Sequence, residues 1–483
     1  PDGSGPSAPT RGEIFLQRRC SSDASAVVVA QGKQKERKYL PLNVPTCYGC
    51  GAPLQTSEPE APGYVQVETY NLKKKHRQLK TVPCGRCKLL SHGHMITAVG
   101  GNGGYSGGRQ FVTAEELRHK LSHLRHEKAL IVKLVDIVDF NGSFLARIRD
   151  IVGANPIILV ITKVDLLPKG TDLNCVGDWV VESTMKKKLN VLSVHLTSSK
   201  SLVGIAGVIS EIQKQKKGRD VYILGAANVG KSAFINGVLK MLSYKDPVAA
   251  AARRYKPIQS AVPGTTLGPI QIEAFPGGGK LFDTPGVHLH HRQAAVVHSE
   301  DLPLLAPKSR LRGESFPKHR LSGGLTGFTI FWGGLVRIDI IKALPTARLT
   351  FYGPKALQLH LVPTEQGDEF YQEQVGILLT PPTGKEKASS SRWMGLGAKR
   401  HLHLKYQDTE RRGYDVAVSG VGWMRVEAAD GGEVREIDLA VHVPKGVEIF
   451  VRPPLPVGND GGEWYEYREL TEMEQEVRPK WYF

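Results

Sequence analysis

The sequence contains no run of about twenty apolar residues, the length that a helix needs to cross the hydrocarbon core of a bilayer. Its longest apolar pieces, such as PIILVI at residues 156–161, have the length of a strand. No internal repeat is evident. A membrane span is therefore not expected. A hydrophobic content of 41% with 23% charged residues is typical of a globular protein, and 483 residues suffice for about three domains.

Acidic residues are few relative to basic ones, 47 against 64, so the net charge is +17. This excess favours a polyanionic partner, and RNA or ribosomes are the most common soluble polyanions. The alternative is a solvated basic surface without a dedicated partner. An initiator methionine is also missing, since the chain begins at Pro1. Residues 1–45 are rich in Ser, Ala, Gly and basic residues, so we expect a disordered lead compatible with the remnant of an organelle transit peptide.

Cysteines are scarce, and four of the six form two pairs, CYGC with Cys47 and Cys50 and CGRC with Cys84 and Cys87. Each C-x-x-C places two thiolates on one tight turn, and two such turns complete the tetrahedral sulfur shell that zinc accepts. We therefore expect a zinc finger over residues 46–100. Disulfides or packed thiols are the alternative, and disulfides are rare in intracellular proteins.

The two pairs are separated by 33 residues, more than usual, which leaves room for a hairpin carrying KKKHR at residues 73–77. His92 and His94 are alternative ligands, but four sulfurs already fill the shell, so we expect them at the surface or near RNA. Cys20 and Cys175 are expected to be ordinary thiols.

From about residue 129 apolar strand-length runs alternate with helical stretches, which predicts a mostly parallel α/β sheet covered by helices. The segment GAANVGKS, residues 225–232, joins such a run to a helix and fits G-x-x-x-x-G-K-[ST]. Its glycines let N–H groups surround phosphates, Lys231 reaches the terminal phosphates and Ser232 ligates Mg²⁺. The nucleotide-binding residues predicted here are Gly225, Asn228, Val229, Gly230, Lys231, Ser232 and Ala233.

Two further segments complete the phosphate side. KLFDTPGV ends an apolar strand in Asp283, which can hold Mg²⁺ through water, and continues to Gly286, whose N–H can meet the γ-phosphate. PGTT at residues 263–266 offers Thr265 or Thr266 as a Mg²⁺ ligand, and the sequence does not decide between them.

The segment TKVD, residues 162–165, resembles the N-K-x-D motif with which GTPases select guanine. Asp165 would accept two hydrogen bonds from the base, and the Lys163 stem would lie against the ring. Thr162 replaces the usual Asn, a departure that can loosen guanine affinity. LTSSK at residues 196–200 resembles the S-A-K loop that supports the base, which adds Ser198, Ser199 and Lys200 to the predicted GTP site.

All five GTPase signatures are thus present, in the order four, five, one, two, three. A Ras-like sheet tolerates such a circular permutation, because cutting the chain after the third motif leaves the packed core unchanged. The permuted order after a zinc finger, from CYGCGAPLQ through CGRC and SHGHMITAVGG to the terminal RPKWYF, resembles the YqeH family of circularly permuted GTPases, and plastid members in particular.

The resemblance implies a GTPase domain at residues 101–296, a linker at 297–325 and a β-rich, RNA-binding-like C-terminal domain at 326–483. It also implies GTP or GDP, Mg²⁺ and Zn²⁺ as ligands and a role in plastid ribosome biogenesis, with rRNA or the small subunit as partner. The sequence does not decide whether mitochondria also receive the protein. Haem, flavin and pterin motifs are missing, so nitric oxide synthesis is not expected. The oligomeric state is left open.

The expected chemistry departs from Ras in one position. Where Ras-type enzymes use Gln to orient water, this chain has Val287, so hydrolysis should be slow. Asn228 stands at the position where potassium-activated GTPases use an Asn side chain to help bind K⁺. Asn228 and Lys231 are the predicted catalytic pair. The alternative is that Asn228 only shapes the loop. The segment just after Gly286 corresponds to switch II of GTPases. The histidines of VHLHHR, His288, His290 and His291, are expected where the chain leaves this segment rather than in catalysis.

The C-terminal third shows the two-residue alternation of strands, interrupted by an expected loop at residues 366–413. Trp332, Trp423, Arg425 and RPKWYF are equally compatible with RNA stacking and with core packing. Two functions follow: a GTP-driven assembly factor, or an RNA-binding scaffold with little turnover, which Val287 and Thr162 favour.

Overall fold

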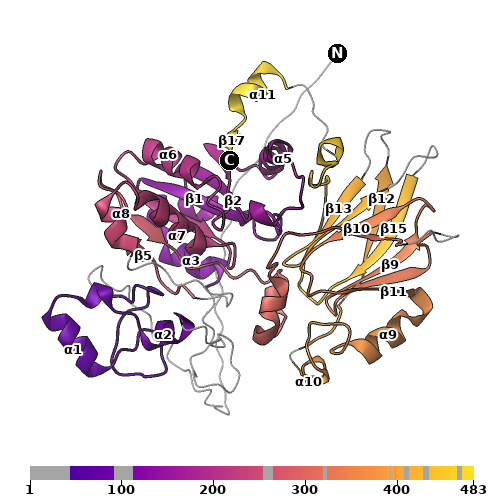
Figure 1. Ribbon diagram of the computed structural model, residues 1–483, viewed down its shortest axis with the longest axis horizontal. Helices are drawn as coiled ribbons and strands as arrows, with labels where there is room; N and C mark the ends of the chain where they lie inside the picture. Colours follow the sequence, from indigo (N-terminus) through magenta and orange to yellow (C-terminus); the bar gives the residue numbers. More distant parts are fainter. Residues whose placement is uncertain are drawn as a thin grey trace, which may run out of the picture. The chain divides into compact units, whose positions relative to one another are not determined.

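The computed structural model describes residues 44–91, 112–253, 265–318, 324–391, 393–397, 399–406, 413–427, 435–464 and 470–483 (Figure 1). The expected lead at residues 1–45 therefore falls almost wholly outside the described residues, as do His92 and His94. No helix within these ranges combines the length and the apolar character that crossing a bilayer requires.

A seven-stranded sheet combines six strands between residues 129 and 283 with β17 near the C-terminus, in the order β17-β3-β2-β1-β4-β6-β5. Its strands are β1 (Ala129–Asp136), β2 (Ile157–Thr162), β3 (Ser193–Leu196), β4 (Asp220–Gly225), β5 (Ile270–Ile272), β6 (Leu281–Asp283) and β17 (Lys480–Tyr482). Neighbouring strands are parallel except β5 and β6. Every residue of β1 and β2 is buried, as uninterrupted apolar strands require when both faces are covered.

Helices cover both faces of this sheet (Figure 1). They are α3 (Ala114–Lys120), α4 (Arg149–Val152), α5 (Leu173–Lys186), α6 (Ile205–Lys216), α7 (Lys231–Leu242) and α8 (Pro247–Ala252). Trp179 of α5 packs in the core on one face, whereas Val208 of α6 and Phe234 of α7 pack in the core on the other. The predicted α/β architecture with a permuted GTPase order is confirmed.

The permutation places the predicted motifs at one edge of the sheet. Each motif begins at the last residue of a strand, TKVD at that of β2, LTSSK of β3, GAANVGKS of β4 and DTPG of β6, and these strands are parallel neighbours around β1. Ligands of open α/β sheets bind at the carboxyl ends of the strands. Segments that stand in unusual order along the chain are therefore adjacent in space.

The last strand, β17, joins this sheet rather than the C-terminal domain in which the sequence places residues 326–483. It pairs with β3, after a short helix α11 (Glu472–Val477). The indole of Trp481 donates to Asp178 (3.0 Å) and covers Gly177, where a Cβ would lie 2.5 Å from the ring. The glycine therefore leaves the space that the terminal tryptophan fills.

The remaining strands form two five-stranded antiparallel sheets, ordered β16-β13-β14-β10-β7 and β11-β8-β9-β15-β12. Their bounds are β7 (Glu314–Phe316), β8 (Phe328–Trp332), β9 (Val336–Lys342), β10 (Arg348–Tyr352), β11 (Leu359–Pro363), β12 (Lys399–Tyr406), β13 (Gly413–Val418), β14 (Gly422–Glu427), β15 (Arg435–His442) and β16 (Ile449–Arg452). One shared core includes Ile338 and Leu439 from one sheet and Leu349 and Val416 from the other, which confirms the β-rich region.

Two segments expected to be irregular carry structure. Within the expected linker, residues 297–325, a 3₁₀ helix η6 (Ser299–Leu305) precedes β7, whose Phe316 is buried and whose Ser315 bonds Thr350. Within the expected loop at 366–413 lie α9 (Gly367–Gln374), α10 (Lys385–Ala388) and β12. The remaining 3₁₀ turns are η1 (Leu79–Thr81), η2 (Ser122–Arg125), η3 (Val164–Leu166), η5 (Gln293–Ala295), η7 (Thr364–Gln366) and η8 (Gly461–Trp464). The exact domain boundaries stay predictions.

The choice between RNA stacking and packing is settled for three residues. Trp332 and Trp423 are 1% and 0% exposed, and Arg425 is 2% exposed. Trp423 stacks on Tyr352 with ring centroids 5.0 Å apart, and Arg425 lies 3.5 Å from Asp415. Side chains enclosed in this way stabilise the core and do not reach RNA.

Candidate functional site: a nucleotide cavity beside a cysteine cluster

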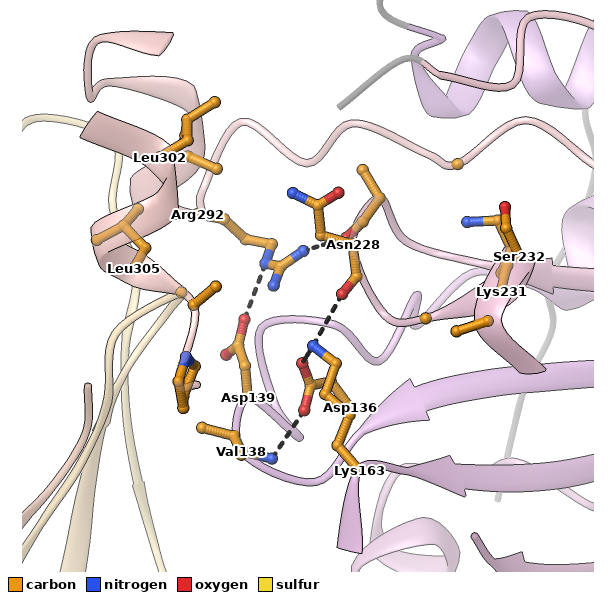
Figure 2. A pocket seen from close by; sticks show the side chains of 18 of the residues that line it. Asp136, Val138, Asp139, Lys163, Asn228, Lys231, Ser232, Arg292, Leu302 and Leu305 are labelled. Atoms are coloured by element: carbon orange, nitrogen blue, oxygen red, sulfur yellow. Dashed lines mark hydrogen bonds and ion pairs between the residues drawn. The ribbon is translucent and has the colours of Figure 1, made fainter. Parts of the chain in front are cut away.

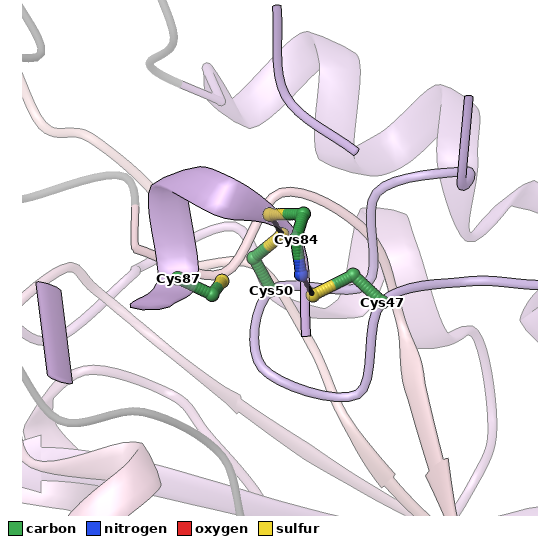
Figure 3. A group of neighbouring side chains, drawn as sticks. All are labelled: Cys47, Cys50, Cys84 and Cys87. Carbon is green, nitrogen blue, oxygen red and sulfur yellow. Dashed lines mark hydrogen bonds between the residues drawn. The ribbon is translucent and has the colours of Figure 1, made fainter. Parts of the chain in front are cut away.

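The four predicted zinc ligands meet in one buried cluster (Figure 3). Their sulfur atoms all lie within 4.8 Å of one another, with Cys50 and Cys84 3.8 Å apart. Gly51, at φ 71°, closes the first turn by donating to the Cys47 carbonyl (2.8 Å), and Cys87 lies in the first turn of α2 (Gly85–Ser91). The geometry fits a tetrahedral zinc ion.

Electrostatics agrees with a cation in this cluster. The Cys47, Cys50 and Cys84 sulfurs, together with burial, raise the pKa of Cys87 above its ordinary value. Four buried thiols cannot all ionise side by side unless a cation compensates their charge. The donor set therefore favours zinc, whose closed sulfur sites are structural and contribute to folding.

The cysteine cluster also contacts the segment that follows the predicted magnesium ligand. The N–H groups of Leu267 and Gly268 both donate to the Cys50 carbonyl, at 2.7 and 3.2 Å. A Cβ on Gly268 would lie 2.5 Å from the Gly51 carbonyl oxygen, so two glycines permit this close approach. Arg86 of α2 donates to the Thr265 carbonyl (3.3 Å). Two backbone hydrogen bonds and the Arg86 side chain thus join the cysteine cluster to residues 265–268.

The phosphate loop has a left-handed backbone at two positions. Asn228 and Gly230 adopt left-handed conformations at φ 62° and 92°, and α7 begins at Lys231. The Lys231 side chain is buried, and its ammonium donates to the carbonyls of Gly225 (3.3 Å) and Ala226 (2.9 Å). Burial lowers the pKa of Lys231 to about 8, an effect that the nearby Asp283 opposes. A phosphate at this position would provide a negatively charged partner for the buried Lys231 ammonium.

The predicted magnesium ligands converge beside this lysine. Asp283 is fully buried, and the Thr266 hydroxyl donates to its Oδ2 (3.5 Å). Burial raises the pKa of Asp283 to about 7, against the opposing effects of Lys231 and of hydrogen bonds from Thr266 and Ser232. Its other oxygen, Oδ1, is buried without a hydrogen-bond partner among the described residues. An unpaired buried carboxylate oxygen is what a Mg²⁺ shell would complete.

TKVD lies against the phosphate loop through side-chain contacts. The Thr162 hydroxyl donates to the Val229 carbonyl (2.7 Å), and the Lys163 ammonium donates to the Asn228 carbonyl (2.9 Å). Thr162 therefore supplies a tie to the loop even though it replaces the usual Asn. Lys163 adopts φ 64°, which turns its side chain back towards the loop.

The base-side residues adjoin this arrangement. Val164 N–H donates to the Thr197 carbonyl (3.2 Å), which holds TKVD against LTSSK, and the Ser198 hydroxyl accepts from the Ser201 N–H (3.1 Å). Asp165 is half-buried in η3. A cavity lies beside the phosphate loop, and its lining among the described residues does not include Asp165, Ser198, Ser199 or Lys200. Residues 198–200 thus adjoin TKVD, the segment that contacts the phosphate loop, but neither they nor Asp165 line the cavity.

The cavity has a volume of about 450 Å³ and lies between the phosphate loop and the segment that follows DTPG (Figure 2). Lys231 and Ser232 lie on one side, and Leu302 and Leu305 of η6 lie on the other. The turn between β13 and β14, with Gly420, also reaches it. The C-terminal region therefore contributes to the wall of the nucleotide cavity.

Three charged residues of this cavity were missed by the sequence reasoning. Asp136 pairs with Lys163 (2.5 Å), and Arg292 pairs through Nε with Asp139 (2.8 Å). Asp136 ends a buried strand at the sheet edge that carries the motifs, which is a signal that could have found it. Arg292 stands directly after the histidines in VHLHHR, but its carboxylate partner is 153 residues away in sequence.

Val287 and the histidines have structural surroundings. Val287 is fully buried, its N–H donates to Gly225, and its carbonyl accepts from Ala227 (2.8 Å). Burial, then His290 and Arg292, lower the pKa of His288 to about 4. His291 Nε2 donates to the Gly142 carbonyl (2.9 Å). None of the three histidines belongs to the described residues that line the cavity, in keeping with their expected place at the switch exit.

A phosphate loop after one strand, a base-recognition segment after another and a buried Asp after a third define a P-loop GTPase, here in permuted order. Two family models match the chain: 50S ribosome-binding GTPase over residues 220–307, and YqeH-like, C-terminal, over residues 346–455. The chain is therefore a GTP hydrolase whose ligands include GTP or GDP and Mg²⁺.

Three relatives extend the likeness over 85% of the chain or more. NO-associated protein 1, chloroplastic/mitochondrial, of Arabidopsis thaliana is 64% identical over 510 residues, which cover 100% of this chain and 91% of the relative. A rice protein (Oryza sativa subsp. japonica) with the provisional name nitric oxide synthase is 65% identical over 506 residues, 100% of this chain and 92% of its own. The uncharacterized protein YqeH of Bacillus subtilis (strain 168) is 32% identical over 409 residues, 85% of this chain and 98% of the relative.

The chain therefore belongs to the YqeH family of GTPases, as its motifs predict. The name of the Arabidopsis relative agrees with the predicted chloroplast localisation, with the mitochondrion as a second compartment.

Proposed function

We propose that this chain is a GTP-driven ribosome-assembly factor of the chloroplast, in which the bound nucleotide controls how the zinc finger holds rRNA. The observation that carries the proposal is the pair of hydrogen bonds from Leu267 and Gly268 to the Cys50 carbonyl. These residues directly follow Thr265 and Thr266. A shift of the threonine segment on hydrolysis would therefore be transmitted to the cysteine cluster.

The proposed site uses the residues that the sequence predicts. Lys231 and the N–H groups of residues 225–233 hold the phosphates, Gly286 meets the terminal phosphate, and Asp165 with Lys163 and residues 198–200 holds guanine. Bound Mg²⁺ neutralises charge on the β- and γ-phosphates. Ser232, Asp283 and a threonine would hold it, and the contact between Thr266 and Asp283 favours Thr266 over Thr265.

The zinc finger offers a surface suited to RNA. Helix α1 (Val67–Lys75) has no buried residue and ends in Lys73, Lys74 and Lys75, followed by the exposed Arg77. A helix that buries nothing gains little from packing, so its basic end is available for phosphate contacts. A triple Ala variant of Lys74, Lys75 and Arg77 should weaken rRNA binding and flatten its salt dependence, whereas the same change at Lys186, Lys188 and Lys214 should have a smaller effect.

Co-sedimentation with purified ribosomal subunits tests which of the two subunits the chain binds. The resemblance to YqeH proteins favours the small subunit, while the description of one matching family model names the 50S subunit. We propose the small subunit. Nucleotide-dependent binding to purified small subunits supports this choice, and binding to large subunits alone contradicts it.

The direct test of the function is Lys231→Ala, with Lys240→Ala near the other end of α7 as the matched control. We expect Lys231→Ala to lose GTP turnover and to fail in complementing ribosome assembly, and Lys240→Ala to do neither. Unimpaired assembly with Lys231→Ala would instead support the scaffold function, which the apolar Val287 at the water-positioning place favours.

Potassium is the remaining cofactor proposal. Asn228 lies in the loop with φ 62°, and its side chain lines the cavity. A K⁺ ion held there would offset charge that develops on the phosphates. Turnover should be faster in KCl than in NaCl, and equal rates would leave Asn228 with a role in loop shape only.

A further inference from the structure

The cavity contains one cation to which the proposed function gives no role. Among the described residues that line it, the basic side chains are Lys163, Lys231 and Arg292. Lys163 belongs to the base side and Lys231 to the phosphates. Arg292 comes six residues after Gly286 and remains unassigned. Val287, which directly follows Gly286, has no polar group to act on water.

The position of Arg292 is fixed by two contacts. Its Nη1 donates to the Ala227 carbonyl (2.6 Å), and its Nε pairs with Asp139 (2.8 Å). The side chain is 11% exposed. Figure 2 shows the guanidinium between Asp139 and the phosphate loop, next to Asn228. No hydrogen bond ties the remaining nitrogen, Nη2, to any residue that the structure describes, so one donor is available to a ligand.

The contact at Ala227 places this guanidinium at the terminal-phosphate corner of the cavity. A Cβ built on Gly286 would lie 2.9 Å from the Ala227 Cα and equally 2.9 Å from the Lys231 ammonium. Gly286, which is assigned to the γ-phosphate, therefore lies against both Ala227, the residue that Arg292 touches, and Lys231. A positive charge here adjoins the bond that hydrolysis breaks.

We propose that Arg292 is a catalytic arginine supplied by the chain itself. In the reaction a water oxygen bonds to the γ-phosphorus while the bond from that phosphorus to the β–γ bridging oxygen breaks. The electron pair stays on GDP, and the water protons go to the released phosphate and to solvent. Arg292 donates to the oxygens on which negative charge grows, the contribution that an arginine finger makes in other GTPases. The inference rests on the proposed GTP site.

Asp139 is the positioning residue in this arrangement. It is buried, and burial raises its pKa while the Arg292 charge opposes the rise. The carboxylate orients the guanidinium towards the loop when no nucleotide competes for it. Since a carboxylate and a phosphate bind a guanidinium in the same geometry, the arginine can exchange one partner for the other without moving far.

Both neighbours of Arg292 are bound by the C-terminal sandwich. The Gln293 N–H donates to the Ser419 carbonyl (3.0 Å), and the Glu448 N–H donates to the His291 carbonyl (3.0 Å). Gly420, at φ 81°, lies so close that a Cβ would be 3.0 Å from the Gln293 nitrogen. The position of the catalytic arginine therefore depends on a turn of the C-terminal region, and Gly420→Ala should also slow turnover.

The test is single-turnover GTP hydrolysis by the full chain in KCl, with nucleotide affinity measured in parallel. Arg292→Ala should hydrolyse GTP about a hundred- to a thousand-fold more slowly, while GDP affinity changes less than about threefold. It should also fail to trap GDP with aluminium fluoride, a mimic of the transferring phosphoryl group. Millimolar guanidinium should restore part of the rate. The matched control is Arg147→Ala, because this side chain is 82% exposed and its one ion pair within the described ranges is with Asp150 at the surface.

Several outcomes overturn the proposal. Arg292→Ala with turnover within about threefold of wild type would do so, as would a variant that binds no GDP or does not fold. Arg292→Lys guards against a purely structural reading, since it keeps the charge and should retain the fold and GDP binding but not the wild-type rate. Loss of nucleotide binding by wild type or by the Arg147→Ala control would contradict the GTP site itself, which separates the two failures.

Discussion

Two buried aspartates, Asp283 in the parallel sheet and Asp415 in the antiparallel sandwich, are both 0% exposed and have opposite surroundings. Asp415 is surrounded by partners: Arg425 (3.5 Å) at one oxygen, and Arg452 (3.7 Å) and the Leu455 N–H (2.8 Å) at the other. Asp283 keeps an oxygen without a hydrogen-bond partner among the described residues. A carboxylate network that is closed, in the sense that both oxygens have partners, stabilises a fold, whereas one with an open oxygen is poised for a ligand.

The largest effect on stability is expected where the network is closed. Asp415→Ala leaves two buried guanidinium groups without their carboxylate, so the free energy of unfolding should fall by about 3–5 kcal/mol. Urea denaturation followed by circular dichroism measures this. The exposed Glu369 of α9 provides the control, since Glu369→Ala should change stability by less than about 0.5 kcal/mol. If Asp415→Ala and Glu369→Ala had equal effects, the partners of Asp415 would not stabilise the fold, and the contrast with Asp283 would fail.

The open network should show the reverse behaviour. Asp283→Asn removes a buried charge that lacks a full set of partners, so the nucleotide-free chain should be as stable as wild type or more stable. Its Mg²⁺-dependent GTP turnover should nevertheless fall by about a hundred- to a thousand-fold, or about 3–4 kcal/mol in the activation barrier. A stability loss as large as that of Asp415→Ala would show that Asp283 is structural.

A smaller effect tests a second open polar group, His195 of β3. It is 2% exposed, its Nδ1 has no hydrogen-bond partner among the described residues, and its ring stacks on Tyr482 of β17. Burial lowers its pKa from 6.5 to about 4. The folded chain therefore binds fewer protons than the unfolded one between these values. Stability present above about pH 6.5 should be lost as the pH falls towards 4, by at most about 3 kcal/mol.

Comparing the unfolding free energies at pH 7.5 and pH 5 measures this loss. His195 Nε2 lies 3.1 Å from the Ser193 hydroxyl. His195→Asn keeps a polar partner for Ser193 but does not titrate, so its pH dependence should be weaker than that of wild type. An identical slope in both proteins would assign the acid sensitivity to other groups.

The sequence reveals the open sites more readily than the closed ones. Lys231, Asp283 and the four cysteines stand in short patterns whose spacing itself brings ligands together, so they were predicted by number. Asp139 and Arg292 pair across 153 residues, and no local pattern announces the pair. Strand β17 has only three residues, and its partner β3 lies almost 300 residues earlier, so no local pattern predicts that the terminal KWY joins the parallel sheet. Trp332 illustrates the same limit, since its burial depends on neighbours from distant strands.

The central claim is that TKVD and GAANVGKS, far apart and in reversed order, form one guanine-nucleotide site. The most direct measurement is calorimetric titration of wild type and Asp165→Asn with GDP and with xanthosine diphosphate. Guanine offers two N–H donors to a carboxylate, whereas xanthine offers one donor and one carbonyl, which suit an amide. We predict that wild type prefers GDP by about a hundred-fold or more and that Asp165→Asn reverses the preference. An unchanged preference in the variant, or equal binding of GDP and ADP by wild type, would contradict the account.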